Sequence, residues 1–187
     1  MTYFHGTSAN NLQNFRFGVL GKGEHSIPFN CIWLSPTFEG AKYHAVQVVG
    51  HVRNTTTNYV YEVLLPSDYV IADIRYYDNI DKYISKRIRV YCLGWSRFLP
   101  WSPRQWHEAL VRYIDSLGLR EDTAIKNEIF KVLKDCGVAA LKNPKFTWRS
   151  EGFLRKRYTF NFFDCVGGEA LALLELGNVQ ISKKYTL

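Results

Sequence analysis

Hydrophobic and polar positions divide this chain into short apolar runs and a few amphipathic segments. Strands are predicted at Thr2–Phe4, Cys31–Leu34, Tyr59–Leu65, Tyr69–Ile74, Val138–Leu141, Tyr158–Phe163, Glu169–Leu176 and Val179–Ser182. The first strand is expected to end at His5-Gly6, and Arg16–Asn30 has the glycine-rich, polar composition of a loop.

Four segments have the spacing or the start signals of helices. Ser8 is a candidate cap for a helix over Asn10–Phe15, and Ser35-Pro36 is a candidate start for the next one. A capping box, with Gln105 three residues after Ser102, predicts a third. A fourth helix is expected at Glu121–Cys136. Apolar stripes support the last three of these helices. They are Ala41, Ala45, Val48 and Val49 after Ser35, then Trp106, Leu110, Tyr113, Ile114 and Leu117 after Ser102, and Ile125, Ile129, Leu133 and Cys136 in the fourth helix. The main helices lie mid-chain between two sets of strands, which predicts a single α+β domain over residues 1–187.

The composition is that of a folding chain, with 47% hydrophobic residues, 12 Phe, 12 Tyr and 5 Trp among 187 residues. No apolar run approaches the roughly 20 residues that span a bilayer, and the first residues do not have the pattern of a signal peptide. The four cysteines lack metal-ligand spacing, so we expect reduced, mostly buried thiols and no metal site. These features favour a cytoplasmic protein without a membrane partner.

Charge is the next feature that changes the picture. The net charge of +7 favours anionic partners such as dinucleotides, nucleic acid or an acidic protein face, or serves solubility alone. Within Lys142–Arg157, cations are interleaved with Phe146, Trp148 and Phe153, a composition that suits phosphates and unstacked bases but is also found in solvated loops. The basic residues that we single out in this segment are Arg149, Arg155, Lys156 and Arg157.

Three segments carry residues typical of a single kind of site. They are Tyr3-Phe4-His5-Gly6-Thr7, then Ile32-Trp33-Leu34-Ser35 with Ala41-Lys42-Tyr43, and a late strand that starts at Gly168-Glu169. With these segments in this order, the chain resembles the ADP-ribosyltransferases of the diphtheria-toxin and poly(ADP-ribose)-polymerase branch. In that branch a strand ends in His-Gly-Thr, a second strand has an Ile-Tyr-Phe-Ser-like run, and a glutamate begins a late strand.

The resemblance implies a split fold of two mostly antiparallel sheets around an NAD cleft, with flanking helices. NAD would be a substrate, and ADP-ribose would be transferred from it to a macromolecular acceptor. By this resemblance the catalytic residues are His5, Trp33 and Glu169, and the residues that contact NAD are His5, Gly6, Thr7, Trp33, Ser35 and Tyr43. In the resembled fold the loop before the catalytic glutamate helps select the acceptor, so the resemblance implies that the acceptor-binding residues are Arg149, Arg155, Lys156 and Arg157.

The chemistry explains why such residues are needed. Cleavage of the bond between nicotinamide and ribose passes through an oxocarbenium-like cation, which a carboxylate such as that of Glu169 stabilises. His5 would donate to or accept from a ribose hydroxyl. The main chain of Gly6 would pair with the nicotinamide carboxamide, and Tyr43 would stack on the cationic ring.

Two points leave alternatives open. Trp33 stands where the family has a tyrosine, and its larger indole could wall the pocket or fill it. Asp164, Glu151 and Glu175 compete with Glu169 for the catalytic role. The alternative functions are an NAD glycohydrolase and a catalytically silent module that binds nucleic acid or protein. The acceptor of ADP-ribose is left open among protein side chains, DNA bases, RNA ends and small molecules. The biological role is also left open among toxin, defence factor and viral effector.

Overall fold

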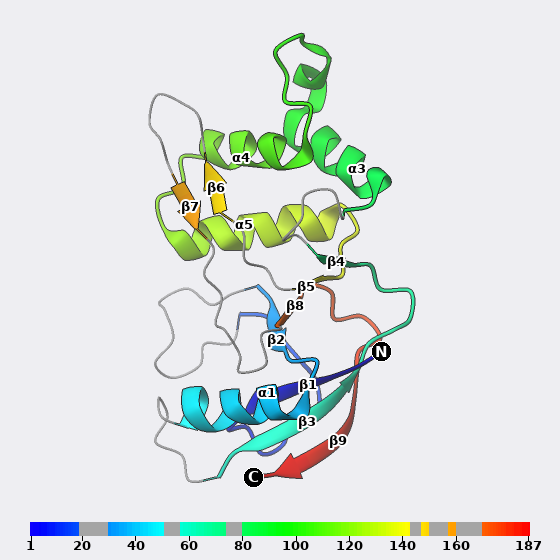
Figure 1. The fold of residues 1–187 in the computed structure, drawn as a ribbon, viewed down its shortest axis with the longest axis vertical. Coiled ribbons are helices and arrows are strands. Elements are labelled where there is room, and N and C mark those ends of the chain that lie inside the picture. The colour runs from blue at the N-terminus through cyan, green and yellow to red at the C-terminus, as the bar shows by residue number, and fades with distance from the viewer. Residues whose placement is uncertain (19–29, 51–56, 74–79, 143–146, 150–156, 160–169) are drawn as a thin grey trace.

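A computed structural model describes residues 1–18, 30–50, 57–73, 80–142, 147–149, 157–159 and 170–187. The chain is a mixed α+β protein in which one sheet and helix α1 lie at one end, a second sheet lies in the middle, and α3, α4 and α5 lie at the other end (Figure 1). The predicted α+β class with two sheets is therefore confirmed.

The first sheet is antiparallel and has the order β1-β3-β9, with bounds Thr2–Thr7, Tyr59–Leu64 and Gln180–Thr186. His5 pairs with Tyr61 and Gly6 pairs with Val60. Strand β1 runs through Thr7, so His5 and Gly6 lie inside the strand and not just after it as the sequence predicted.

The second sheet has the order β2-β8-β5-β4, with bounds Ile32–Leu34, Leu171–Leu173, Ala140–Lys142 and Ile71–Asp73. Its pairs are antiparallel except β4 with β5. A β-bridge between Phe4 and Ser35 connects it to the first sheet: Phe4 N–H donates to Ser35 C=O over 2.8 Å, and Ser35 N–H donates to Phe4 C=O over 2.7 Å.

One apolar cluster fills the space between the two sheets. Its buried members are Leu34, Val63, Leu65, Ala140, Leu171 and Leu173, with Tyr3, Phe15, Ile32 and others packed around them. Because side chains alternate along a strand, Leu171 and Leu173 face this cluster while Ala172, between them, faces the helices.

The helices that cover the second sheet are α3 (Lys82–Leu93), α4 (Trp106–Ser116) and α5 (Asp122–Asp135). A larger core of buried residues, including Ile88, Leu110, Phe130 and Leu133, joins them to the sheet. Gly118 and Gly137 follow the ends of α4 and α5 and have positive φ angles, which glycine adopts readily at the end of a helix. A 3-10 helix at Gly94–Phe98 follows α3, and β6 (Thr147–Arg149) pairs antiparallel with β7 (Arg157–Thr159).

The start of the chain differs from the prediction. Residues 10–15 do not form a helix, because the Tyr61 hydroxyl donates to the carbonyls of Ala9 and Asn10 and accepts from the Leu12 N–H. These bonds to a distant strand replace the bonds that a helix would make within itself.

Two further predictions about helices were wrong in detail. Helix α1 (Phe38–Tyr43) is capped by Thr37, not Ser35, and continues as a π-helix over His44–Gly50. Helix α4 begins after Gln105, not after Ser102. Ser102 is instead in a turn, where its N–H donates to the Leu99 C=O. Helix α3 was not predicted at all.

Cys31, Cys92 and Cys136 are free thiols. Burial raises the pKa of Cys92 to about 12 and that of Cys136 to about 11, so both stay protonated at neutral pH. Among the described residues, no helix is long and apolar enough to cross a bilayer.

Candidate functional site

His5 is fixed where the two sheets meet. Its Nδ1 lies 2.9 Å from the main-chain oxygen of Trp33. A carbonyl oxygen only accepts, so Nδ1 carries the proton and donates it. In the neutral imidazole the other nitrogen, Nε2, is then a hydrogen-bond acceptor.

The surroundings of His5 keep it neutral. Burial lowers the pKa of His5 to about 4; the bond to the Trp33 carbonyl opposes this shift, and the charge of His44 adds to it. The Phe15 ring also packs against the imidazole in a T-shaped arrangement, with the ring centres 5.2 Å apart. His5 therefore presents an acceptor, not a positive charge, at neutral pH.

The main chain of Gly6 lies along the edge of β1 that faces away from β3. Phe4 exchanges both of its main-chain bonds with Ser35, so it does not bond to β3. Main-chain groups alternate in direction along an antiparallel strand, so Gly6, two residues later, also points its N–H and C=O away from β3. The two groups lie side by side on the strand that holds His5.

Helix α1 packs directly on Gly6. A Cβ at this position would overlap the Ala41 carbonyl oxygen and come within 3.0 Å of the Ala45 nitrogen. The sequence suggested that a side chain here would block NAD. The structure adds another reason for glycine, because a side chain would also push α1 off the sheet.

Ser35 and Thr7 have local hydrogen-bond partners. Ser35 is buried, and its hydroxyl accepts from the Thr37 N–H over 3.2 Å, just before Thr37 caps α1. The Thr7 hydroxyl accepts from the Ala9 N–H over 3.2 Å. Both hydroxyls shape the turns that flank His5 and Gly6.

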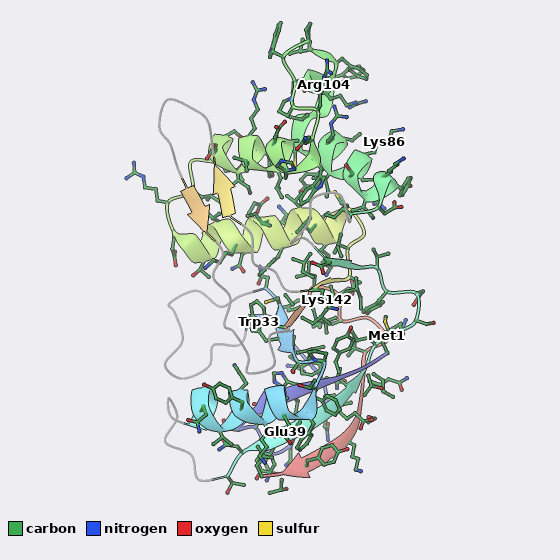
Figure 2. All side chains as sticks on the ribbon, viewed as in Figure 1. Met1, Trp33, Glu39, Lys86, Arg104 and Lys142 are labelled. Carbon is green, nitrogen blue, oxygen red and sulfur yellow. The ribbon has the colours of Figure 1, made fainter. Side chains whose placement is uncertain are left out.

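The two aromatic candidates lie in different environments. Trp33 is half-buried and packs against the core of the helices (Figure 2). Its main-chain carbonyl accepts from His5. Tyr43 is 41% exposed near the end of α1, two residues from the Ala41 and Ala45 main-chain atoms that contact Gly6.

Sequence reasoning missed Tyr61 and His44. Tyr61 pairs with His5 across the sheet, and its hydroxyl holds the segment Ala9–Leu12 beside the histidine. The charge of His44 acts on His5. No sequence signal could have found either one, since each approaches His5 only through strand pairing or helix packing.

The acidic candidates differ in how much of their surroundings is described. Strand β8 begins at Leu171, which pairs with Leu34, the neighbour of Ser35. Glu175 follows the opposite end of β8, where its carboxylate accepts from the N–H groups of Gly177 and Leu176 and pairs with Lys134 at 3.4 Å. The Gly177 N–H is the main reason for the lowered pKa of Glu175. Glu169, Asp164 and Glu151 lie outside the described residues.

The predicted acceptor loop is described only in part. The backbones of Arg149 and Arg157 belong to the paired strands β6 and β7, where these two residues are partners. Arg155 and Lys156 lie outside the described residues. Within the described ranges, no three His, Cys, Asp or Glu residues are grouped so as to hold a metal ion.

Comparison of this chain with family models, with curated proteins and with solved structures finds no match.

Proposed function

We propose that this protein is an NAD-dependent mono-ADP-ribosyltransferase that moves ADP-ribose to a macromolecular acceptor and releases nicotinamide. One observation carries the proposal: a neutral His5, fixed by the Trp33 carbonyl, stands next to the main-chain groups of Gly6 that point away from β3, where the two sheets meet. These are the groups that a ribose hydroxyl and a carboxamide need.

The role of His5 follows from its proton. Since Nδ1 donates to Trp33, Nε2 accepts a hydrogen bond from a ribose hydroxyl and orients the sugar. A charged imidazolium would instead repel the cationic nicotinamide ring and the oxocarbenium-like transition state. The lowered pKa of His5 avoids this repulsion.

The main chain of Gly6 fits the nicotinamide carboxamide. Its C=O would accept from the carboxamide NH₂, and its N–H would donate to the carboxamide oxygen, as a neighbouring strand would. Tyr43, exposed close to this edge, would cover the cationic ring.

A carboxylate completes the chemistry. Glu169 precedes the end of β8 that lies by Ser35, whereas Glu175 follows the other end and its oxygens are already bonded. This favours Glu169 as the group that stabilises the ribosyl cation while the bond from C1′ to nicotinamide breaks and its electron pair leaves with nicotinamide. The acceptor then bonds to C1′ and gives up a proton.

The test uses NAD⁺ labelled in the adenylate phosphate, incubated with the protein and cell extract. We expect nicotinamide release together with label on macromolecules, and digestion by nuclease or by protease then identifies the acceptor. His5→Asn and Glu169→Gln should each abolish transfer, whereas Glu175→Gln, the matched control, should retain it.

The same assay separates the other functions. Free ADP-ribose without labelled macromolecules would indicate an NAD glycohydrolase. Neither nicotinamide release nor binding of NAD⁺ would indicate a silent module, and the proposal would be wrong.

A further inference from the structure

The segment Lys82–His107 concentrates positive charge at the helical end of the molecule. It contains no Asp or Glu, and its cations are Lys82, Lys86, Arg87, Arg89, Arg97 and Arg104. Within the described part of the chain, none of the six is in an ion pair. Their charge is therefore available to an anionic partner.

The same segment exposes large aromatic rings. We use the term tip loop for Gly94–Arg104, which connects α3 to α4 and projects from the end of the molecule opposite the first sheet (Figure 1). Trp95 is 86% exposed, Trp101 is 69% exposed and Phe98 is 66% exposed. Apolar groups gathered in this way on a surface mark a binding site more often than chance.

Cations and rings pair along this surface. The Arg97 guanidinium carbon lies 4.3 Å from the centre of the Phe98 ring, and that ring lies 6.1 Å from the nearer Trp95 ring centre. On α3, Arg87 lies over the Tyr83 ring at 5.8 Å. Flat rings next to positive charge form a surface that suits both a base and its phosphate.

A shallow hollow continues the surface along α3. It has a volume of about 310 Å³ and is lined by Tyr83, Lys86, Arg87 and Tyr91 on α3, with Asp135 and Cys136 at the end of α5. The one acidic side chain there is that of Asp135, which accepts from the Tyr91 hydroxyl over 3.3 Å. Arg89 connects the helix to the tip loop by donating to the Pro103 carbonyl over 3.3 Å.

We propose that this basic and aromatic face, formed by α3 and the tip loop, binds single-stranded nucleic acid. Twelve residues of α3 rise about 18 Å along the axis, so cations and rings follow one another over a length that suits a linear polyanion. The strand must be single because base faces are stacked and hidden in a duplex.

The composition favours nucleic acid over an anionic membrane. The exposed hydrophobic side chains of the tip loop are mainly rings, with Leu99 as the aliphatic exception. Cations extend down α3 as far as Lys82, beyond the tip that a flat bilayer would contact first. Lys86 and Arg104 lie at this end, away from Trp33 and Glu39 (Figure 2).

The test measures fluorescence anisotropy of labelled oligo(dT) and oligo(U) with the full chain, over a range of salt and without NAD⁺. Trp95→Ala with Phe98→Ala should weaken binding about tenfold or more, because stacking is lost. Lys86→Gln with Arg104→Gln should reduce the slope of log K against log salt by about 1.4, about 0.7 for each phosphate contact.

The control is Lys42→Gln with Lys183→Gln, which removes the same charge from exposed sites on α1 and β9. This control should reduce the slope of log K against log salt by less than about half as much as the Lys86 and Arg104 variant does. Absence of binding, or equal effects of the control and the α3 variant, would overturn the proposal. Binding to phosphatidylserine vesicles with no oligonucleotide binding would also overturn it, in favour of a membrane. Because NAD⁺ is absent, none of these results depends on the transferase activity.

Discussion

His5 has an uncharged ring because burial disfavours the charged imidazolium and lowers its pKa. A bond to the Trp33 carbonyl, the Phe15 ring and the charge of His44 fix its orientation and its protonation state together. Only the main chain of Trp33 takes part in this bond. Tryptophan at position 33, where the resembled family has a tyrosine, therefore leaves the histidine's partner unchanged.

The low pKa of His5 links it to stability. The unfolded chain binds a proton near pH 6.5, whereas the folded chain does so only near pH 4. As pH falls from 6.5 towards 4, the unfolded state gains protons, and His5 should lower the free energy of unfolding by up to about 3 kcal/mol. His5→Asn keeps a donor for Trp33 but has no proton to gain. Urea unfolding should therefore show the wild type losing stability relative to His5→Asn across this range, and a constant difference would contradict the shifted pKa.

Tyr43 tests the ring contact with nicotinamide. If the ring stacks on the cation, Tyr43→Ala should weaken NAD⁺ binding about two- to fivefold, while Tyr43→Phe should bind nearly as the wild type does. Val46→Ala is the matched control, since Val46 is similarly exposed, at 40%, just after α1. Calorimetric titration measures all three. Equal affinity in Tyr43→Ala and the wild type would remove Tyr43 from the site.

Among the elements, α1 and β1 depend on each other most closely. Phe38 packs edge-on against Phe4 and Tyr185, with ring centres 5.9 and 5.1 Å apart, and Gly6 admits the helix main chain beside them. Thr37 begins the helix by accepting from the Gly40 N–H. The helix is therefore positioned by β1 and also borders the main-chain edge that we assign to the carboxamide.

Gly6→Ala should separate these two elements. The added methyl would overlap main-chain atoms of Ala41, which cannot rotate away, so we expect a loss of about 1–3 kcal/mol or more in the free energy of unfolding. Gly177→Ala is the control, since a Cβ there meets nothing closer than 3.5 Å. Denaturant unfolding compares the two, and equal stability in both variants would show that α1 does not pack on Gly6 in this way.

Elements differed in how well the sequence predicted them. Strands β2 and β3 and helices α4 and α5 have strong apolar patterns and were found within a few residues. Helix α3 was missed because its exposed face mixes cations with Tyr83, Val90 and Tyr91. These residues obscure the apolar stripe of Ile84, Ile88 and Leu93, which faces inward. Its cap, Asp81, accepts from the N–H groups of Tyr83 and Ile84, and this was the signal that could have found it.

The whole molecule separates two kinds of surface. The junction of the sheets carries a neutral histidine and main-chain donors and acceptors, whereas the helical end carries cations and exposed rings. The sequence predicted that His5 and the second strand would be close, because the motifs follow one another in the resembled family. It did not predict the basic and aromatic face of α3 and the tip loop, because the mixture of cations and rings in Lys142–Arg157 indicated that segment instead.

Hydrogen exchange with and without NAD⁺, followed by mass spectrometry, tests the central claim most directly. We expect NAD⁺ to slow exchange in β1 and the following residues to Phe17, in β2 and in α1, and to leave α3 and the tip loop unchanged. Oligo(dT) should slow exchange in α3 and the tip loop instead. Unchanged exchange in β1 and β2 at a saturating concentration of NAD⁺, or slowing confined to α3 and α4, would contradict the assignment of the NAD site to His5 and Gly6.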